Sequence, residues 1–132
     1  MKNNKKNKNI PPVVEIEDCS FEESSYKRRE FVWTAKSLYK EAELEKLTPF
    51  EFPLASFDLS KLGFRLDDIF DFIYQVKRVM NVDTSIPIIF DNEGQLADGY
   101  HRVCRALLDG KATIKAYRLK KMPDYDHRET VE

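Results

Sequence analysis

Hydrophobic residues along the first third of the chain form short strand-like runs followed by a helix-like stripe. Residues 13–17 and 31–33 are rich in β-branched and aromatic side chains and predict two strands. The polar stretch 20–30 predicts a loop that joins them as an irregular hairpin. Thr34 is a good N-cap for a helix that runs to about Lys46. This part of the chain therefore predicts a β-β-α unit.

The rest of the chain continues the alternation. Residues 50–52 begin a strand that we expect to start late or to lie at an edge, because Pro53 has no amide hydrogen to donate. Residues 66–80 form the clearest amphipathic helix, with acidic residues near its start and basic residues near its end, as the helix dipole favours. Further elements are predicted as strands at 86–90, 95–97 and 113–119, with a helix at 100–108. The order β-β-α-β-α-β-β-α-β predicts an α+β fold, a small mixed sheet with helices packed on it.

The chain length supports a single domain with a sizeable core. Residues 1–9 contain only lysine and asparagine after the first methionine, so we expect a disordered basic tail there. The domain is predicted to span residues 10–121, and residues 122–132 to form a polar C-terminal tail.

The charge distribution argues against a body that binds nucleic acid. Four of the 22 basic residues lie in the N-terminal tail, so the remaining 18 face 23 acidic ones and the body carries about five net negative charges. The tail leaves a nucleic-acid contact open. The run Lys27-Arg28-Arg29 is interpreted as a solvated loop tip, with a contact patch as the alternative.

The two cysteines and the apolar runs bear on the compartment. Cys19 and Cys104 have no metal-ligand spacing and are interpreted as buried reduced thiols, which favours a cytoplasmic protein. No apolar run approaches the ~18 residues that a membrane span needs. No apolar segment follows the basic N-terminus, so we expect no secretory signal peptide.

The stretch from Asp91 to Arg102 carries the candidate chemistry. It predicts a tight turn, a short strand, a glycine at position 99 and the start of a helix. The first turn of a helix presents backbone amides without partners inside the helix and the positive end of its dipole, so it favours an anion, above all a phosphate. On a helical wheel His101 and Arg102 lie on the polar arc, opposite Val103 and Leu107. They are therefore predicted to be free of the core. The alternative is that they are ordinary exposed residues and that Asp98 is only a cap or turn residue.

Other site chemistries have weaker support. A metal at His101 would need carboxylates from elsewhere in the chain, because His127 in the tail is the only other histidine. The acidic residues Asp67, Asp68 and Asp71 are better explained by the dipole of the helix that they begin. No Gly-x-Ser-x-Gly nucleophile motif occurs. We therefore predict no metal site.

A longer pattern resembles a known family. It runs from Pro87-Ile88-Ile89-Phe90-Asp91 to Asp98-Gly99-Tyr100-His101-Arg102 and continues with Ala106, Gly110 and the strand Thr113-Ile114-Lys115-Ala116. This pattern resembles the ParB/sulfiredoxin superfamily, and especially its short stand-alone ParB-like proteins. The match covers about residues 86–119, and the helix at 66–80 fits the same fold.

The resemblance implies a nucleotide site. In sulfiredoxins a Gly-Cys-His-Arg box places the histidine and arginine on nucleotide phosphates and supplies the catalytic thiol. Here Gly99, His101 and Arg102 match that box, but Tyr100 replaces the cysteine, so we expect no sulfiredoxin reductase activity. In ParB proteins, which bind CTP, the box resembles Gly-Glu-Arg-Arg, and Tyr100 replaces the acid. Gly99, Tyr100, His101 and Arg102 are the predicted cofactor-binding residues.

The first functional hypothesis is a phosphotransferase or NTPase that binds ATP, ADP or CTP with Mg²⁺ and acts on an unknown small-molecule or protein acceptor. Relatives with catalytic acids carry them in the earlier strand-loop region, where this chain has Asp58, so the predicted catalytic residues are Asp58, Asp98 and His101. The alternatives are a regulatory module that binds a nucleotide without turnover and a DNA-associated ParB-like protein or nuclease.

Overall fold

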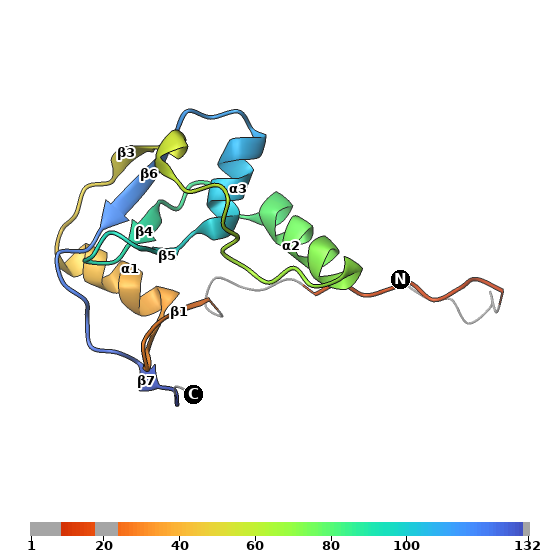
Figure 1. Cartoon of the computed structure of the whole chain (residues 1–132), viewed down its shortest axis with the longest axis horizontal. Coiled ribbons are helices and arrows are strands. Elements are labelled where there is room, and N and C mark those ends of the chain that lie inside the picture. The colour runs from red at the N-terminus through yellow and green to blue at the C-terminus, as the bar shows by residue number, and fades with distance from the viewer. Residues whose placement is uncertain (1–8, 18–23, 131–132) are drawn as a thin grey trace.

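The computed structural model describes residues 9–17 and 24–130, and these residues form two β-sheets and three α-helices (Figure 1). The α+β character predicted from the sequence is confirmed. In chain order the elements are β1 (Ser25–Arg28), β2 (Phe31–Thr34), α1 (Ala35–Leu44), β3 (Phe50–Pro53), the 3₁₀ turn η2 (Leu54–Ser56), α2 (Ile69–Asn81), β4 (Ile88–Phe90), β5 (Leu96–Asp98), α3 (Tyr100–Leu108), β6 (Thr113–Arg118) and β7 (His127–Arg128).

The larger sheet has four strands in the order β3-β6-β4-β5. Strands β4 and β6 are parallel, with Ile88 opposite Ala116, and the other two pairs are antiparallel. The chain between the two parallel strands first forms β5 at the edge of the sheet and then α3, which crosses over one face. The expectation that Pro53 marks an edge strand is confirmed, because β3 pairs only with β6 among the described strands.

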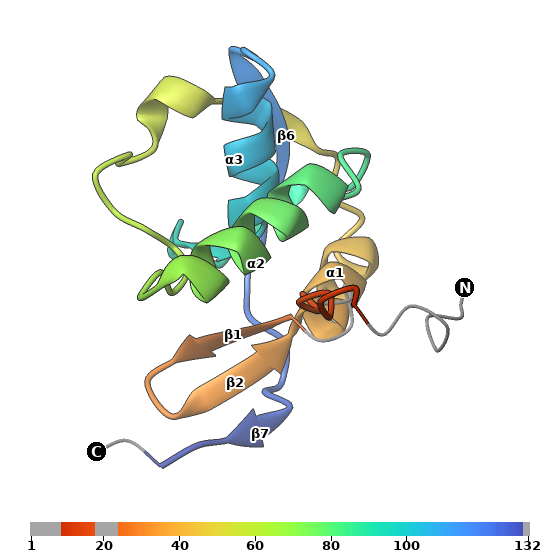
Figure 2. The ribbon, with the colours of Figure 1, turned by 90° about the vertical axis from the view of Figure 1, so that its right-hand side faces the viewer.

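Helices cover both faces of this sheet. All three residues of β4 are buried, and consecutive side chains on a strand point to opposite faces. Ile89 packs in one hydrophobic cluster with Leu38 of α1, and Ile88 packs in the other with Val103 of α3. Helix α2 lies across the outer side of α3 and forms a further layer (Figure 2).

The smaller sheet, with the order β1-β2-β7, corrects the predicted hairpin. The described residues 13–17 form no strand, and Val13 is largely exposed. The partner of β2 is instead β1, within the stretch that was expected to be a loop, and a two-residue turn at Arg29–Glu30 joins them. A hairpin with so short a loop costs less closure entropy than one that spans residues 18–30.

The segment after Lys121, expected to be a polar tail, contributes β7 to this sheet. Arg128 pairs with Phe31. The indole Nε1 of Trp33 donates a hydrogen bond to the carbonyl oxygen of Pro123 at 2.8 Å, and Asp126 accepts one from the amide of Thr34 at 2.8 Å. These long-range bonds tie the C-terminal segment to the β1-β2 hairpin.

The helix starts follow the sequence signals. Thr34 caps α1 as predicted, with its hydroxyl accepting from the amide of Ser37. Helix α2 begins at Ile69, three residues later than predicted, because Asp68 takes the N-cap position and accepts from the amide of Asp71 at 2.8 Å. Of the expected basic tail, residues 1–8 lie outside the described part of the chain. Among the described helices, none has the length and apolar character needed to cross a membrane.

Candidate functional site

The predicted junction of strand, glycine and helix is present at β5 and α3. Strand β5 ends at Asp98, Gly99 adopts φ +119°, and α3 starts at Tyr100. A Cβ atom on Gly99 would lie only 2.4 Å from Cγ2 of Ile88. Only glycine allows this combination of positive φ and close approach. The conformation at Gly99 therefore fixes the direction in which α3 starts and in which the backbone amides of its first turn point.

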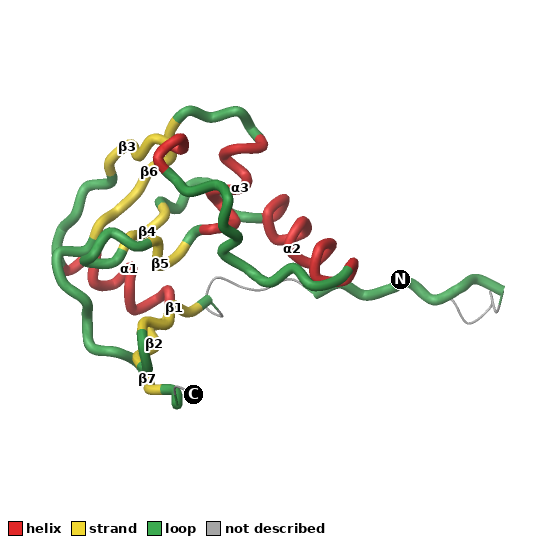
Figure 3. Tube along the Cα trace, viewed as in Figure 1, coloured by secondary structure: helices red, strands yellow, loops and turns green. Residues whose placement is uncertain are grey.

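That turn lies in a cleft of about 720 Å³. One wall is the junction itself, and the opposite wall is β1 with the turn that follows it. Figure 3 shows the long loop between η2 and α2 in green. Gly63 and Phe64 of this loop also line the cleft. Its charged lining side chains are the cations Lys27, Arg28, Arg29 and Arg78 and the acids Glu93 and Asp98. The lining is therefore net basic, although the body as a whole is acidic.

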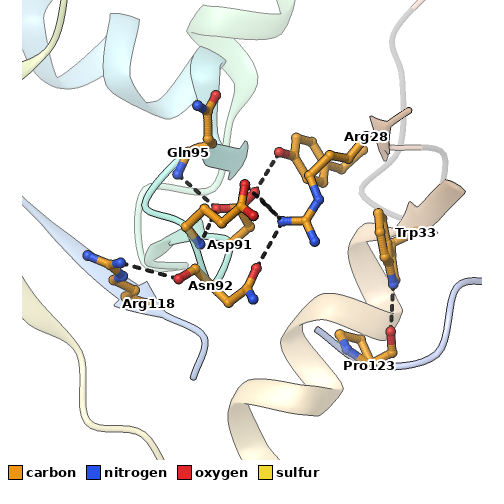
Figure 4. A network of polar contacts seen from close by, with 9 residues as sticks. Arg28, Trp33, Asp91, Asn92, Gln95, Arg118 and Pro123 are labelled. Atoms are coloured by element: carbon orange, nitrogen blue, oxygen red, sulfur yellow. Dashed lines mark hydrogen bonds and ion pairs between the residues drawn. The ribbon is translucent and has the colours of Figure 1, made fainter. Parts of the chain in front are cut away.

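Buried Asp91 fixes the basic wall of the cleft (Figure 4). Its side chain has 0% exposure and accepts hydrogen bonds from the hydroxyl of Tyr26 at 2.7 Å and from Nη1 of Arg28 at 3.0 Å. Its other oxygen accepts from the backbone amides of Glu93 and Gln95, both at 2.9 Å. This carboxylate, directly after β4, thus joins the β1 strand to the turn that leads into β5.

The charge state of this network is well defined. Burial alone would raise the pKa of Asp91. The hydrogen bonds from the amide of Gln95 and the hydroxyl of Tyr26 outweigh this effect, so the pKa of Asp91 lies below its usual value of 3.8. Burial and the bond to Asp91 raise the pKa of Tyr26. At neutral pH Asp91 is therefore an anion that holds a neutral Tyr26 and a charged Arg28.

Arg102 corrects the helical-wheel prediction. Its side chain is buried and does not line the cleft. The guanidinium pairs with Asp98 and donates through Nη2 to the hydroxyl of Tyr39 at 3.0 Å and through Nη1 to the carbonyl of Ile86 at 3.3 Å. The wheel fails because the guanidinium turns back to Asp98 at the end of β5, and its other partners lie on α1 and just before β4. Arg102 therefore stabilises the junction through these hydrogen bonds and does not reach into the cleft.

His101 does line the cleft, as predicted. Its ring stacks on Phe64 with centroids 4.7 Å apart, and its Nε2 lies 2.6 Å from Oε1 of Gln75. The amide nitrogen of Gln75 donates to the carbonyl of Arg65, which orients Oε1 toward the histidine. Because Oε1 only accepts, we assign a proton to Nε2 of His101.

Tyr100 also belongs to the cleft, whereas Asp58 does not. The ring of Tyr100 packs so closely on Gly63 that a Cβ there would lie 2.0 Å from it. Asp58 is exposed after η2 and accepts from the hydroxyl and the amide of Ser60, which lower its pKa. Of the three predicted catalytic residues, the structure thus brings Asp98 and His101 together in the cleft and leaves Asp58 outside it.

The interpretation of Cys104 fits its position. Its thiol is half-buried beside α2, and burial raises its pKa. A thiol of this kind is a poor nucleophile. Cys19 lies outside the described residues. No group of three or more metal-ligating side chains occurs in the described ranges.

Sequence reasoning did not place the basic wall beside the junction. The run Lys27-Arg28-Arg29 was the one available signal, and its alternative interpretation as a contact patch matches its place at the cleft. Nothing in the pattern marked Arg78, Gln75 or the buried role of Asp91. Comparisons with protein-family models, curated proteins and solved structures give no match for this chain. The resemblance of the Asp98–Arg102 box to the ParB/sulfiredoxin superfamily therefore stays a prediction.

Proposed function

We propose that this chain binds a nucleotide by its phosphates in the basic cleft, as a ParB/sulfiredoxin-like protein with phosphotransferase or NTPase activity. The observation that carries the proposal is the cleft itself, which is lined by the first turn of α3 and by four cationic residues. Two of these, Arg29 and Arg78, form no ion pair with any residue that the structure describes. A helix N-terminus and guanidinium groups are two independent ways to stabilise a phosphate. ATP, ADP and CTP are the candidate ligands.

The lining residues suggest a division of roles. The amides after Gly99 would hold one phosphate, and Arg29 and Arg78 would neutralise the others. Mg²⁺ would arrive with the nucleotide and neutralise charge on its phosphates, with Asp98 as the carboxylate nearest the junction.

A second candidate is a module that binds a nucleotide without turnover. One observation favours it: the carboxylate of Asp98 already accepts hydrogen bonds from Arg102 and Tyr39, and Asp58 lies outside the cleft. A base engaged in this way is less able to activate an attacking hydroxyl. Nucleotide bound for hours without product would support this second candidate.

Calorimetric titration of the full chain with ATP, ADP and CTP, with and without Mg²⁺, tests the proposal. Replacing Arg29 or Arg78 by glutamine removes one phosphate contact and should weaken binding by about tenfold each. Lys36→Gln is the matched control, because Lys36 is exposed on α1 and does not line the cleft. No binding heat with any of the nucleotides, or equal affinity in all three variants, would contradict the proposal.

Arg102 provides a separate check on the geometry. Arg102→Lys should lower the melting temperature, because lysine cannot reach Asp98, Tyr39 and Ile86 together. The folded fraction should still bind nucleotide, since Arg102 does not line the cleft. If Arg102→Lys keeps full stability and loses all binding, the direct phosphate contact predicted from the sequence is the better interpretation.

A further inference from the structure

The turn between β1 and β2 has an arginine at a position where hairpins favour glycine or asparagine. Arg28 pairs with Phe31, so the turn consists of Arg29 and Glu30 alone. Two-residue hairpin turns need a positive φ at their first residue, and Arg29 has a φ of +60°. For a residue with a side chain this left-handed conformation costs free energy. We therefore expect the turn to be less stable with arginine than with glycine.

The side chain of Arg29 makes no contact within the protein that would offset this cost. It has no hydrogen bond, ion pair or ring partner among the residues that the structure describes. The other three cations of the cleft are engaged. Lys27 and Arg28 have carboxylate partners 3.2 Å and 3.0 Å away, and the guanidinium of Arg78 lies 5.8 Å from the centre of a tyrosine ring. Arg29 is exposed and lines the cleft, so its guanidinium can contact a ligand there.

The position of Arg29 separates it from the junction. The first turn of α3 belongs to one wall of the cleft, and the turn after β1 belongs to the opposite wall. The cleft volume of about 720 Å³ is much larger than a single phosphate group. A guanidinium binds a phosphate through two parallel hydrogen bonds. If the amides after Gly99 hold one phosphate, the contact made by Arg29 is therefore to another phosphate of the same ligand.

We propose that Arg29 determines which nucleotides the cleft accepts, by contacting a phosphate beyond the one held at the α3 turn. This inference rests on the proposed binding of nucleotides in the cleft. The contact selects ligands with at least two phosphates, such as ADP, over AMP, which has one. Residues in costly backbone conformations are concentrated at binding sites. The turn is thus less stable than it could be, and its arginine gives the cleft its selectivity.

Arg29→Gly tests the selectivity and the backbone strain in one variant. Glycine relieves the strain at a φ of +60° but makes the unfolded chain more flexible, so the melting temperature of the full chain should rise by about 1–4 °C. The variant also lacks the guanidinium. Calorimetric titration should therefore show binding of ADP weakened by about tenfold and binding of AMP changed by less than about twofold.

Lys46→Gly is the matched control. Lys46 also has a positive φ, of +55°, but it follows α1 and does not line the cleft. Glycine at this position relieves the same kind of strain. The melting temperature should therefore rise by a similar amount, and the affinities for ADP and AMP should stay at their wild-type values.

The outcomes separate this inference from the proposed function. A wild-type chain that binds neither ADP nor AMP contradicts both proposals. Binding of ADP that Arg29→Gly leaves unchanged, or an equal loss of affinity for ADP and AMP, overturns the role of Arg29 and leaves nucleotide binding in place. A melting temperature that rises in Lys46→Gly but not in Arg29→Gly contradicts the strain at the turn and overturns the inference as well.

Discussion

Asp91 offers the sharpest test of how the cleft is built. Asp91→Ala removes the acceptor for four donors: the hydroxyl of Tyr26, the guanidinium of Arg28, and the amides of Glu93 and Gln95. A buried donor left without a partner costs about 1–3 kcal/mol. Arg28 is partly exposed and keeps a hydrogen bond to Asn92, so its share is smaller than for a fully buried pair. We expect the free energy of unfolding to fall by about 3–4 kcal/mol in total.

Asp91→Asn removes the negative charge of the side chain but keeps its shape, so it separates the two contributions to stability. Its Oδ1 still accepts from both backbone amides, but its amide nitrogen faces the guanidinium of Arg28, which is also a donor. We expect a loss of about 1–2 kcal/mol, smaller than for alanine. Urea unfolding measures both values, and the slope with denaturant should not change. The control is Asp58→Ala, which removes an exposed carboxylate bonded only to its own loop.

The acid limb of the stability curve gives a second measurement. The pKa of Asp91 is lowered in the folded state, so its contribution is fully present above the unfolded value near 3.8 and is lost as the pH falls through the lower folded value. Wild-type protein should therefore lose stability below pH 3.8 more steeply than Asp91→Asn. If Asp91→Ala costs less than about 1 kcal/mol, or if the two acid limbs are parallel, Asp91 does not hold the wall together.

Two further predictions test the junction and the C-terminal segment. Gly99→Ala should destabilise the fold by about 2–4 kcal/mol, because the new Cβ meets Ile88. The control is Gly110→Ala, which is also at positive φ but in open space and should cost about 1 kcal/mol. Equal losses of stability in chemical denaturation would show that the close approach to Ile88 is unimportant. Truncation after Lys121 should shift the fluorescence of Trp33, the only tryptophan, to longer wavelength, since it removes the partner of the indole nitrogen; an unchanged spectrum would mean that the C-terminal segment does not cover the hairpin.

The elements that the sequence predicted correctly have signals within a few residues. Thr34 before α1 and Gly110 after α3 are local caps, and both lie where the pattern placed them. The turn at Gly94 and the junction at Gly99 need positive φ, which glycine supplies. These features depend on the chemistry of neighbouring residues, so a single sequence is enough to find them.

The features that the sequence did not predict depend on contacts between distant residues. Residues 13–17 have the composition of a strand but join no sheet, while Ser25–Arg28 is polar and pairs with β2. A helical wheel treats α3 as isolated and so cannot know that Tyr39 and the carbonyl of Ile86 lie where Arg102 folds back. Strand formation and burial here are set by the tertiary partner.

The two walls of the cleft therefore have different origins, and this affects which residues can carry its chemistry. The junction wall is a local motif. Gly99 fixes its backbone conformation, and the hydrogen bond from Arg102 to Asp98 stabilises it. The basic wall is tied to the turn before β5 through Asp91, which lies 63 residues away from Arg28 along the chain. A motif search finds the first wall alone, and the first wall offers little beyond amides, His101 and an engaged Asp98. The proposed binding of anions would thus depend most on the hairpin, since the lining cations come from β1, the turn after it and α2, and not from the box that first drew attention to the site.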